Sequence, residues 1–154
     1  MQQEQDLTVV KPNSSQKKRF LVVDDEVDIT TVFKLGLERV DFQVDVYNDP
    51  SLALRDYKRG MYDLLLLDIK MPQMNGFELY KGIKDKENDG SSDVHDNDNG
   101  KPREPRVCFI TAYEEYCSQF KESFPILEEV DCYLRKPITI DNLVKAAKSQ
   151  LRLV

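Results

Sequence analysis

The chain has 154 residues, of which 40% are apolar, and its formal net charge is −6. This length suits a single domain with a substantial core. The negative charge argues against a nucleic-acid-binding surface spread over the domain, because such surfaces are usually basic. No apolar stretch approaches the roughly 20 residues that a membrane span needs, and the polar first 19 residues lack the apolar run of a signal peptide. We therefore expect a cytoplasmic protein with no membrane segment and no direct contact with nucleic acid.

The three cysteines, Cys108, Cys117 and Cys132, have an odd count and no CxxC spacing. In a cytoplasmic protein this pattern predicts reduced, mostly buried thiols and not a disulfide framework.

The first quarter of the chain predicts a tail, then a strand, a helix and a second strand. Residues 1–18 are polar and predict a flexible N-terminal tail ahead of one domain over residues 19–154. The apolar residues 20–23 predict a buried strand, which ends in the acidic run Asp24-Asp25-Glu26. Apolar residues at helical spacing predict an amphipathic helix over 28–40, and alternation over 42–46 predicts a half-buried or edge strand.

The next segment contains the most apolar run of the chain. Asp49 and Pro50 predict a helix start, and the helix should reach about Arg59 before Gly60. The run of four leucines over 64–67 does not alternate, which predicts a strand buried on both faces, with Asp68 directly after it. A loop through Gly76 and a helix over about 77–84 should follow.

The remaining segments add an insertion and two further strands. Residues 85–105 hold almost no core-forming side chains and predict an acidic, disordered insertion. A strand over 107–111, a helix over about 114–124 that Pro125 ends or interrupts, a strand over 131–136 and a closing helix over 140–151 complete the chain. Thr139 is the expected N-cap of that last helix.

Five strands that alternate with five helices predict an α/β fold with a doubly wound, five-stranded parallel sheet. The expected strand order is 2-1-3-4-5, which places a topological switch point between the first and third strands. Polar residues end four of the strands, and they should meet at one edge of the sheet. These residues are Asp24, Asp25, Asp68, Thr111 and Lys136.

The residue types at this edge suit phosphoryl transfer. Two carboxylates about 4 Å apart repel by roughly 4 kcal/mol near a protein surface, and a hard divalent cation such as Mg²⁺ removes that repulsion. A carboxylate can itself be the nucleophile and form an aspartyl phosphate, and we assign this role to Asp68. The Lys136 ammonium and the Thr111 hydroxyl would stabilise the transferred phosphoryl group.

Taken together, these motifs resemble a response-regulator receiver domain of two-component signalling, of the stand-alone, single-domain type. The resemblance covers about residues 19–153 in order and spacing, apart from the insertion, and it implies a flavodoxin-like three-layer sandwich. The residues that carry it are Asp24-Asp25, Asp68, Met71-Pro72, Gly76, Thr111-Ala112, Tyr133 and Lys136-Pro137.

The resemblance implies that Asp68 is the phosphoacceptor. It also implies a Mg²⁺ site formed by Asp24, Asp25, Asp68 and the backbone carbonyl of Lys70, and no other cofactor.

The resemblance further implies that Thr111 and Tyr133 form a switch, in which the Thr111 hydroxyl moves toward the phosphoryl group and the Tyr133 rotamer follows it. Lys136 should pair with the phosphoryl group, and the Lys136–Pro137 peptide bond should be cis.

The implied partners are a sensor histidine kinase or phosphotransfer protein, which would dock on the first helix, and a downstream protein target. A homodimer would use the face of the fourth helix, fifth strand and fifth helix. Such a protein is no enzyme beyond its own phosphotransfer and slow self-dephosphorylation.

Three alternative functions fit the sequence less well than a phosphorylated receiver domain. A pseudo-receiver that never carries phosphate would act as a protein-interaction module, but the complete acidic set argues against it. A phosphatase of the haloacid-dehalogenase type would want a second Asp two residues after Asp68, where this chain has Lys70. A flavodoxin-like FMN protein would want a hydroxyl-rich phosphate loop where this chain has Asp24-Asp25-Glu26.

Overall fold

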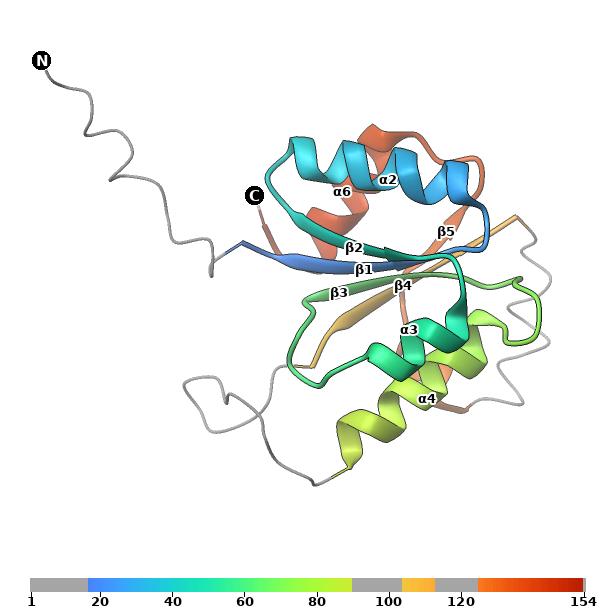
Figure 1. Cartoon of the computed structure of the whole chain (residues 1–154). Helices are drawn as coiled ribbons and strands as arrows, with labels where there is room; N and C mark the ends of the chain where they lie inside the picture. Colours follow the sequence, from blue (N-terminus) through green and yellow to red (C-terminus); the bar gives the residue numbers. More distant parts are fainter. Residues whose placement is uncertain (1–16, 90–103, 113–124, 154) are drawn as a thin grey trace, which may run out of the picture.

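Five parallel strands form a sheet through the middle of the molecule, in the order β2-β1-β3-β4-β5 (Figure 1). The computed structural model describes residues 17–89, 104–112 and 125–153. Within them the strands are β1 (Arg19–Val23), β2 (Gln43–Tyr47), β3 (Leu64–Asp68), β4 (Arg106–Thr111) and β5 (Tyr133–Arg135). The predicted fold class and strand order are therefore confirmed.

Helices cover both faces of the sheet (Figure 1). Helices α2 (Val27–Arg39) and α6 (Ile140–Gln150) lie on one face, and α3 (Pro50–Asp56) and α4 (Gly76–Asn88) lie on the other. A short 3₁₀ helix, η3 (Pro125–Glu129), precedes β5. The helix predicted over 114–124, the tail over residues 1–16 and residues 90–103 of the insertion lie outside the described residues. None of the described helices is long and apolar enough to cross a membrane.

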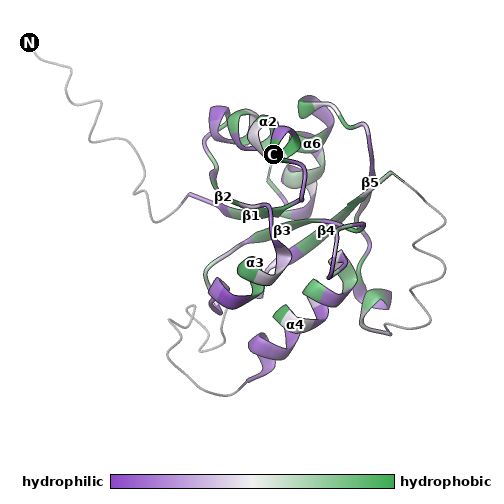
Figure 2. Cartoon of the chain, turned by 45° about the vertical axis from the view of Figure 1, so that its right-hand side comes forward, coloured by the Kyte–Doolittle hydropathy of each residue, from purple (hydrophilic) through white to green (hydrophobic). Residues whose placement is uncertain are grey.

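The leucine run of β3 contributes side chains to the hydrophobic cores on both faces of the sheet. Successive side chains of a strand point to opposite faces. Leu64 and Leu66 pack in the cluster beneath α2 and α6, while Leu65 and Leu67 pack in the cluster beneath α3 and α4. All four are at most 1% exposed, and full burial of such a side chain stabilises the fold by roughly 1.5–3 kcal/mol. In Figure 2 the hydrophobic colour runs along the strands of the sheet, while helix α4 is mostly hydrophilic.

Local sequence signals start three of the helices. The Asp49 side chain accepts a hydrogen bond from the backbone N–H of Ser51, and the Thr139 side chain accepts one from Asn142, so both predicted N-caps are confirmed. The sequence analysis missed a capping box at α4, in which Asn75 and Glu78 satisfy each other's backbone N–H groups.

Two predicted helix ends were wrong. Helix α3 ends at Asp56, before the predicted Arg59. Helix α4 continues past the predicted Lys84 to Asn88, into the stretch predicted as insertion. Tertiary contacts explain this extension, because Lys86 donates to backbone carbonyls at the end of α3 and the buried Glu87 accepts from the Tyr57 hydroxyl. Neither contact is visible in the local pattern of apolar residues.

The prediction of reduced thiols was wrong for two of the three cysteines. Cys108 in β4 and Cys132, directly before β5, form a disulfide with a Cα–Cα distance of 4.6 Å. The cause is the pairing of β4 with β5, which places two residues 24 positions apart in the chain side by side. Spacing along the sequence does not reveal such a neighbour.

Gly76 holds the turn that leads from β3 into α4. Its backbone N–H donates to the carbonyl oxygen of Ile69 at 2.8 Å. A Cβ atom at this position would lie 2.3 Å from the backbone oxygen of Asp68. Only glycine therefore allows the start of α4 to approach the end of β3 so closely.

We predict that Gly76→Ala destabilises the protein by roughly 1–3 kcal/mol, because the new methyl group must displace backbone at Asp68. Thermal unfolding with and without the substitution measures this effect. Gly82→Ala is the matched control: it lies inside α4 and meets only the end of the Leu54 side chain, so its unfolding temperature should change little. Equal effects of the two substitutions would contradict the prediction.

Candidate functional site

Three carboxylates meet at the carboxyl edge of the sheet, as predicted. Asp24 and Asp25 follow β1, and Asp68 is the last residue of the neighbouring strand β3. One oxygen from each of the three side chains lies within 4.8 Å of the others. Asp24 and Asp68 are buried whereas Asp25 is exposed, so the cluster is enclosed on the sheet side and reachable from the Asp25 side.

Neighbouring polar groups hold Asp24 in place. Its carboxylate accepts a hydrogen bond from the backbone N–H of Glu26 at 2.9 Å. The Asn48 side chain donates to the backbone oxygen of Asp24 at 2.8 Å and to the Thr30 hydroxyl at 2.9 Å. The sequence analysis did not identify Asn48 or Thr30, because nothing in their local pattern marks them as supports of the acidic cluster.

Lys136 brings a positive charge into the cluster. Its ammonium nitrogen lies 2.8 Å from an oxygen of Asp24 and 3.2 Å from an oxygen of Asp68. The Lys136 backbone N–H donates to the Thr111 carbonyl at 2.8 Å, and the peptide bond to Pro137 is cis, as predicted. Glu26 approaches the same ammonium at 3.4 Å, a contact that the acidic run in the sequence could have suggested.

Burial and neighbouring charges together shift the pKa values of these groups. Burial raises the pKa of Asp68 to about 7, and the nearby Asp24 charge adds to the increase, while Lys136 opposes it. Burial also raises the pKa of Asp24 above its usual range. The ion pairs with both carboxylates outweigh the effect of burial on Lys136 and raise the pKa of its ammonium. The site therefore carries more negative charge than Lys136 alone can offset.

The donor set fits a hard divalent cation. Carboxylate oxygens are the ligands that Mg²⁺ and Ca²⁺ prefer, and three of them converge here without a Cys or His among them. A cation between them would offset the charge repulsion that adds to the effect of burial on the pKa of Asp68. Lys70 lies two residues after Asp68 and is exposed. That its backbone carbonyl is a ligand of the metal stays a prediction.

Thr111 and Tyr133 lie on the β4 and β5 side of the cluster. Thr111 is the buried last residue of β4, one position beyond the residue that pairs with Asp68. Tyr133 begins β5, and its ring stacks on Phe109 with centroids 5.7 Å apart. Phe109, which the sequence analysis treated only as a strand residue, also contacts the rings of Phe77 and Tyr80 in α4. It therefore connects the Tyr133 ring to helix α4.

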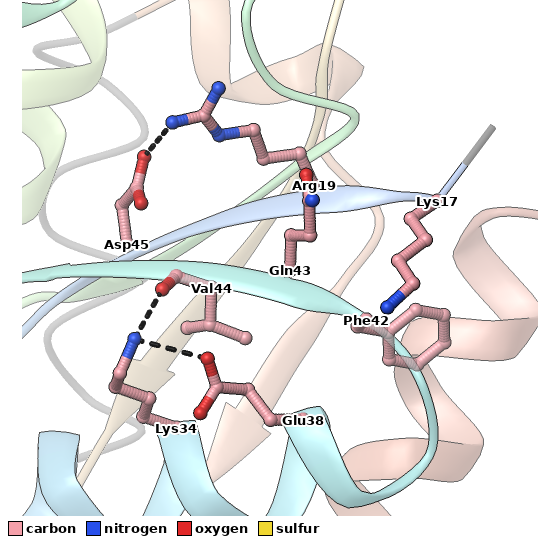
Figure 3. A pocket seen from close by; sticks show the side chains of 8 residues that line it. All are labelled: Lys17, Arg19, Lys34, Glu38, Phe42, Gln43, Val44 and Asp45. Atoms are coloured by element: carbon pink, nitrogen blue, oxygen red, sulfur yellow. Dashed lines mark hydrogen bonds and ion pairs between the residues drawn. The ribbon is translucent and has the colours of Figure 1, made fainter. Parts of the chain in front are cut away.

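A separate hollow at the other end of the sheet does not resemble a functional site (Figure 3). It has a volume of about 460 Å³ and lies near the start of β1 and β2. Each of its cations already has an acidic partner: Lys17 pairs with Asp41, Arg19 with Asp45 and Lys34 with Glu38. Lys34 also donates to the backbone oxygen of Val44, which covers part of the free edge of β2.

Comparison with known proteins agrees with this geometry. A family model described as "response regulator receiver domain" matches residues 20–148. The chain is 30% identical over 156 residues to Probable histidine kinase 1 of Oryza sativa subsp. indica, covering 91% of this chain and 16% of that protein. It is 26% identical to the transcriptional regulatory protein TrcR of Mycobacterium tuberculosis, covering 87% of this chain and 45% of that protein. The chain thus spans less than half the length of either relative.

Solved structures extend the comparison to three dimensions. The response regulator TrrA of Thermotoga maritima, solved in complex with Mg²⁺ and BeF, matches with a TM-score of 0.65 at 29% identity and covers 86% of this chain and 98% of its own. The receiver domain of HemR from Leptospira biflexa matches with a TM-score of 0.67 at 23% identity and covers 90% of this chain and 97% of its own, which supports the fold alone. The family model and the shared fold together show that the chain belongs to the response regulator receiver domains of two-component systems.

Proposed function

We propose that the chain is a phosphorylation-dependent signalling switch, in which Asp68 accepts a phosphoryl group from a histidine of a sensor kinase or phosphotransfer protein. The observation that carries the proposal is the position of the Asp68 carboxylate. It ends the central strand of the sheet, lies 3.2 Å from the Lys136 ammonium, and meets two further carboxylates within 4.8 Å.

In this proposal an oxygen of the Asp68 carboxylate attacks the phosphorus atom of the phosphohistidine. The bond between phosphorus and nitrogen breaks, the electron pair stays with the imidazole nitrogen, and the phosphoryl group remains on Asp68 as an acyl phosphate. The carboxylate must be ionised to attack. Because the pKa of Asp68 is raised to about 7, a change in the surrounding charge changes the fraction of Asp68 that is ionised near neutral pH.

Lys136 and Thr111 would stabilise the phosphoryl oxygens. The Lys136 ammonium already lies between Asp24 and Asp68, so it can pair with an oxygen of the transferred group without a large movement. Thr111 ends the adjacent strand, and its hydroxyl would contact a second oxygen. Asp24, Asp25, Asp68 and the Lys70 carbonyl would hold Mg²⁺, which would neutralise charge at the phosphoryl group.

The hollow beside Lys136 suits the docking of the phosphoryl donor. It has a volume of about 520 Å³ and is lined by residues of α2 and of the loop after β5, including Ile29, Phe33 and Ile138. Val32 of the same surface is 52% exposed. Val27 and Leu35 of α2 are exposed as well, and a group of exposed apolar side chains on one helix fits a contact surface for another protein.

The signal would leave through β4, β5 and the neighbouring helices. Movement of the Thr111 hydroxyl toward the phosphoryl group would vacate space near Tyr133, whose ring stacks on Phe109. A change of the Tyr133 rotamer would then alter the outer surface at β5, where a downstream protein or a second copy of the chain would bind.

We predict that incubation with acetyl phosphate and Mg²⁺ adds one phosphoryl group to the chain, and that Asp68→Asn abolishes this gain. Intact-mass spectrometry measures it. Asp49→Asn is a matched control with the same chemical change, because Asn caps α3 as well as Asp does, and it should keep the gain. If the wild type gains no mass at saturating acetyl phosphate, the proposal fails in favour of a protein-interaction module that never carries phosphate.

We predict that Asp25→Ala removes the stabilisation that Mg²⁺ confers, because it deletes the exposed ligand of the cluster. Ligand binding to the folded state raises the unfolding temperature, and the stabilisation grows with the ratio of free ligand to its Kd, so thermal unfolding across a Mg²⁺ titration measures the effect. Asp28→Ala, in the first turn of α2 but outside the cluster, should keep it. Survival of the full Mg²⁺ effect in Asp25→Ala would contradict the assigned metal site.

We predict that Asp68→Asn makes the metal-free protein more stable than the wild type at pH 8, and that the difference shrinks by roughly 1–2 kcal/mol at pH 5.5. The sign follows from the pKa of about 7 in the folded state, which exceeds the ordinary value near 3.9 in the unfolded state. Between these two pKa values Asp68 is protonated in the folded wild type and ionised in the unfolded chain. The free energy of unfolding of the wild type therefore falls as pH rises through this range.

Chemical denaturation in EDTA at both pH values measures this difference. Glu128→Gln, exposed on η3, serves as the control. A difference between Asp68→Asn and wild type that is the same at pH 5.5 and pH 8 would show that the Asp68 carboxylate does not resist ionisation in the fold.

A further inference from the structure

The disulfide between Cys108 and Cys132 joins the two chain segments that lead to Thr111 and Lys136 of the functional site. Cys108 belongs to β4, and Cys132 directly precedes β5. A backbone hydrogen bond of 3.0 Å from Phe109 to the Cys132 carbonyl joins the two strands at the same level. Cys108 is three residues before Thr111, and Cys132 is four residues before Lys136. The crosslink therefore joins the two segments that deliver the hydroxyl and the ammonium to the phosphoryl site.

Among the strands of this sheet, β5 gains most from a crosslink to its neighbour. It has three residues, lies at the edge of the described sheet, and pairs with β4 over three register positions. Short edge segments with few hydrogen bonds are among the first parts of a fold to open. The disulfide holds the beginning of β5 against β4, so that Tyr133 and Lys136 leave it from a fixed position.

The surroundings of the crosslink leave little room for two separate thiols. Cys108 is fully buried and Cys132 is 6% exposed. Both lie in the cluster under α2 and α6, with Ile110, Leu143 and Ala147. Two thiol sulfurs need van der Waals separation, whereas bonded sulfurs approach much more closely. Because protein cores are close-packed, the added volume must displace neighbouring groups, and the short edge strand offers the least resistance.

We propose that Cys108 and Cys132 form a reversible thiol–disulfide switch, and that the oxidised form holds β5 in the position that accepts phosphate. The redox chemistry stands by itself, and the effect on phosphorylation rests on the function proposed above. This assigns a regulatory modification to two core residues of the chain.

A dithiol reductant reverses the crosslink in two balanced steps. One thiolate of the reductant attacks the sulfur of Cys132, the residue that keeps some exposure, and Cys108 leaves as a thiolate that takes up a proton. The second thiolate of the reductant then attacks the reductant's first sulfur, which is bonded to Cys132 in the mixed disulfide. Cys132 is released as a thiol and the reductant becomes a cyclic disulfide. Two electrons pass from the reductant to the chain. In the opposite direction, a small disulfide such as oxidised glutathione accepts two electrons and forms two thiols.

The first test counts thiols and measures stability in the full chain. A Cys117→Ser background leaves Cys108 and Cys132 as the remaining cysteines. After incubation with oxidised glutathione, labelling of the denatured chain should find no free thiol, and after dithiothreitol it should find two. The oxidised form should unfold roughly 5–10 °C higher, as expected for a crosslink that closes a loop of this length. Two free thiols under both conditions would overturn the disulfide.

The second test measures the rate of phosphorylation by acetyl phosphate in both forms. We expect the oxidised chain to be phosphorylated at least about threefold faster than the reduced chain. A Cys108→Ala, Cys132→Ala double variant cannot form the crosslink, so its rate should be the same with and without dithiothreitol. Since reduced wild type is measured directly, the test does not depend on the folding of that variant.

The outcomes separate this proposal from the function on which it rests. If both forms are phosphorylated at the same rate, the switch is overturned and the phosphoacceptor role of Asp68 stands. If neither form gains a phosphoryl group, both the proposed function and its redox control fail, while the thiol count and the unfolding temperatures still decide whether the crosslink is reversible.

Discussion

The mutual repulsion of buried carboxylates is the constraint on which the site depends. Asp24 and Asp68 are almost fully buried, and two such charges about 4 Å apart repel by roughly 4 kcal/mol even at a moderate effective dielectric constant. Lys136 contacts both of them and offsets part of this cost. The remaining negative charge favours the binding of a cation between the carboxylates.

The hydrophobic cores on the two faces of the sheet offset the free-energy cost of this concentration of charge. Strands β1, β3 and β4 reach this edge after runs of buried residues, and the leucines of β3 contribute to the cores on both faces of the sheet. The interactions that stabilise the fold thus lie away from the groups that destabilise it. Gly76 connects the two regions, since its missing side chain lets α4 start against the backbone of Asp68.

Sequence reasoning succeeded where the signal is local. The apolar runs, the N-caps at Asp49 and Thr139, and the polar residues at strand ends led to the strand order and to the acidic cluster with its lysine. It failed where the signal comes from a distant segment. Helix α4 extends to Glu87 because the Glu87 carboxylate accepts a hydrogen bond from the Tyr57 hydroxyl, and Asn48, directly after β2, donates to the backbone oxygen of Asp24.

The sequence by itself determined the α/β class and the polar residues that end the strands, because alternation, run length and capping act over a few neighbouring residues. The strand order followed from the general topology of doubly wound sheets. Only the tertiary structure decided how these residues act on one another. It brought Lys136 into contact with two carboxylates, raised the pKa of Asp68, and paired Cys108 with Cys132. Each of these depends on distance and burial between segments far apart in the chain, which no local pattern encodes.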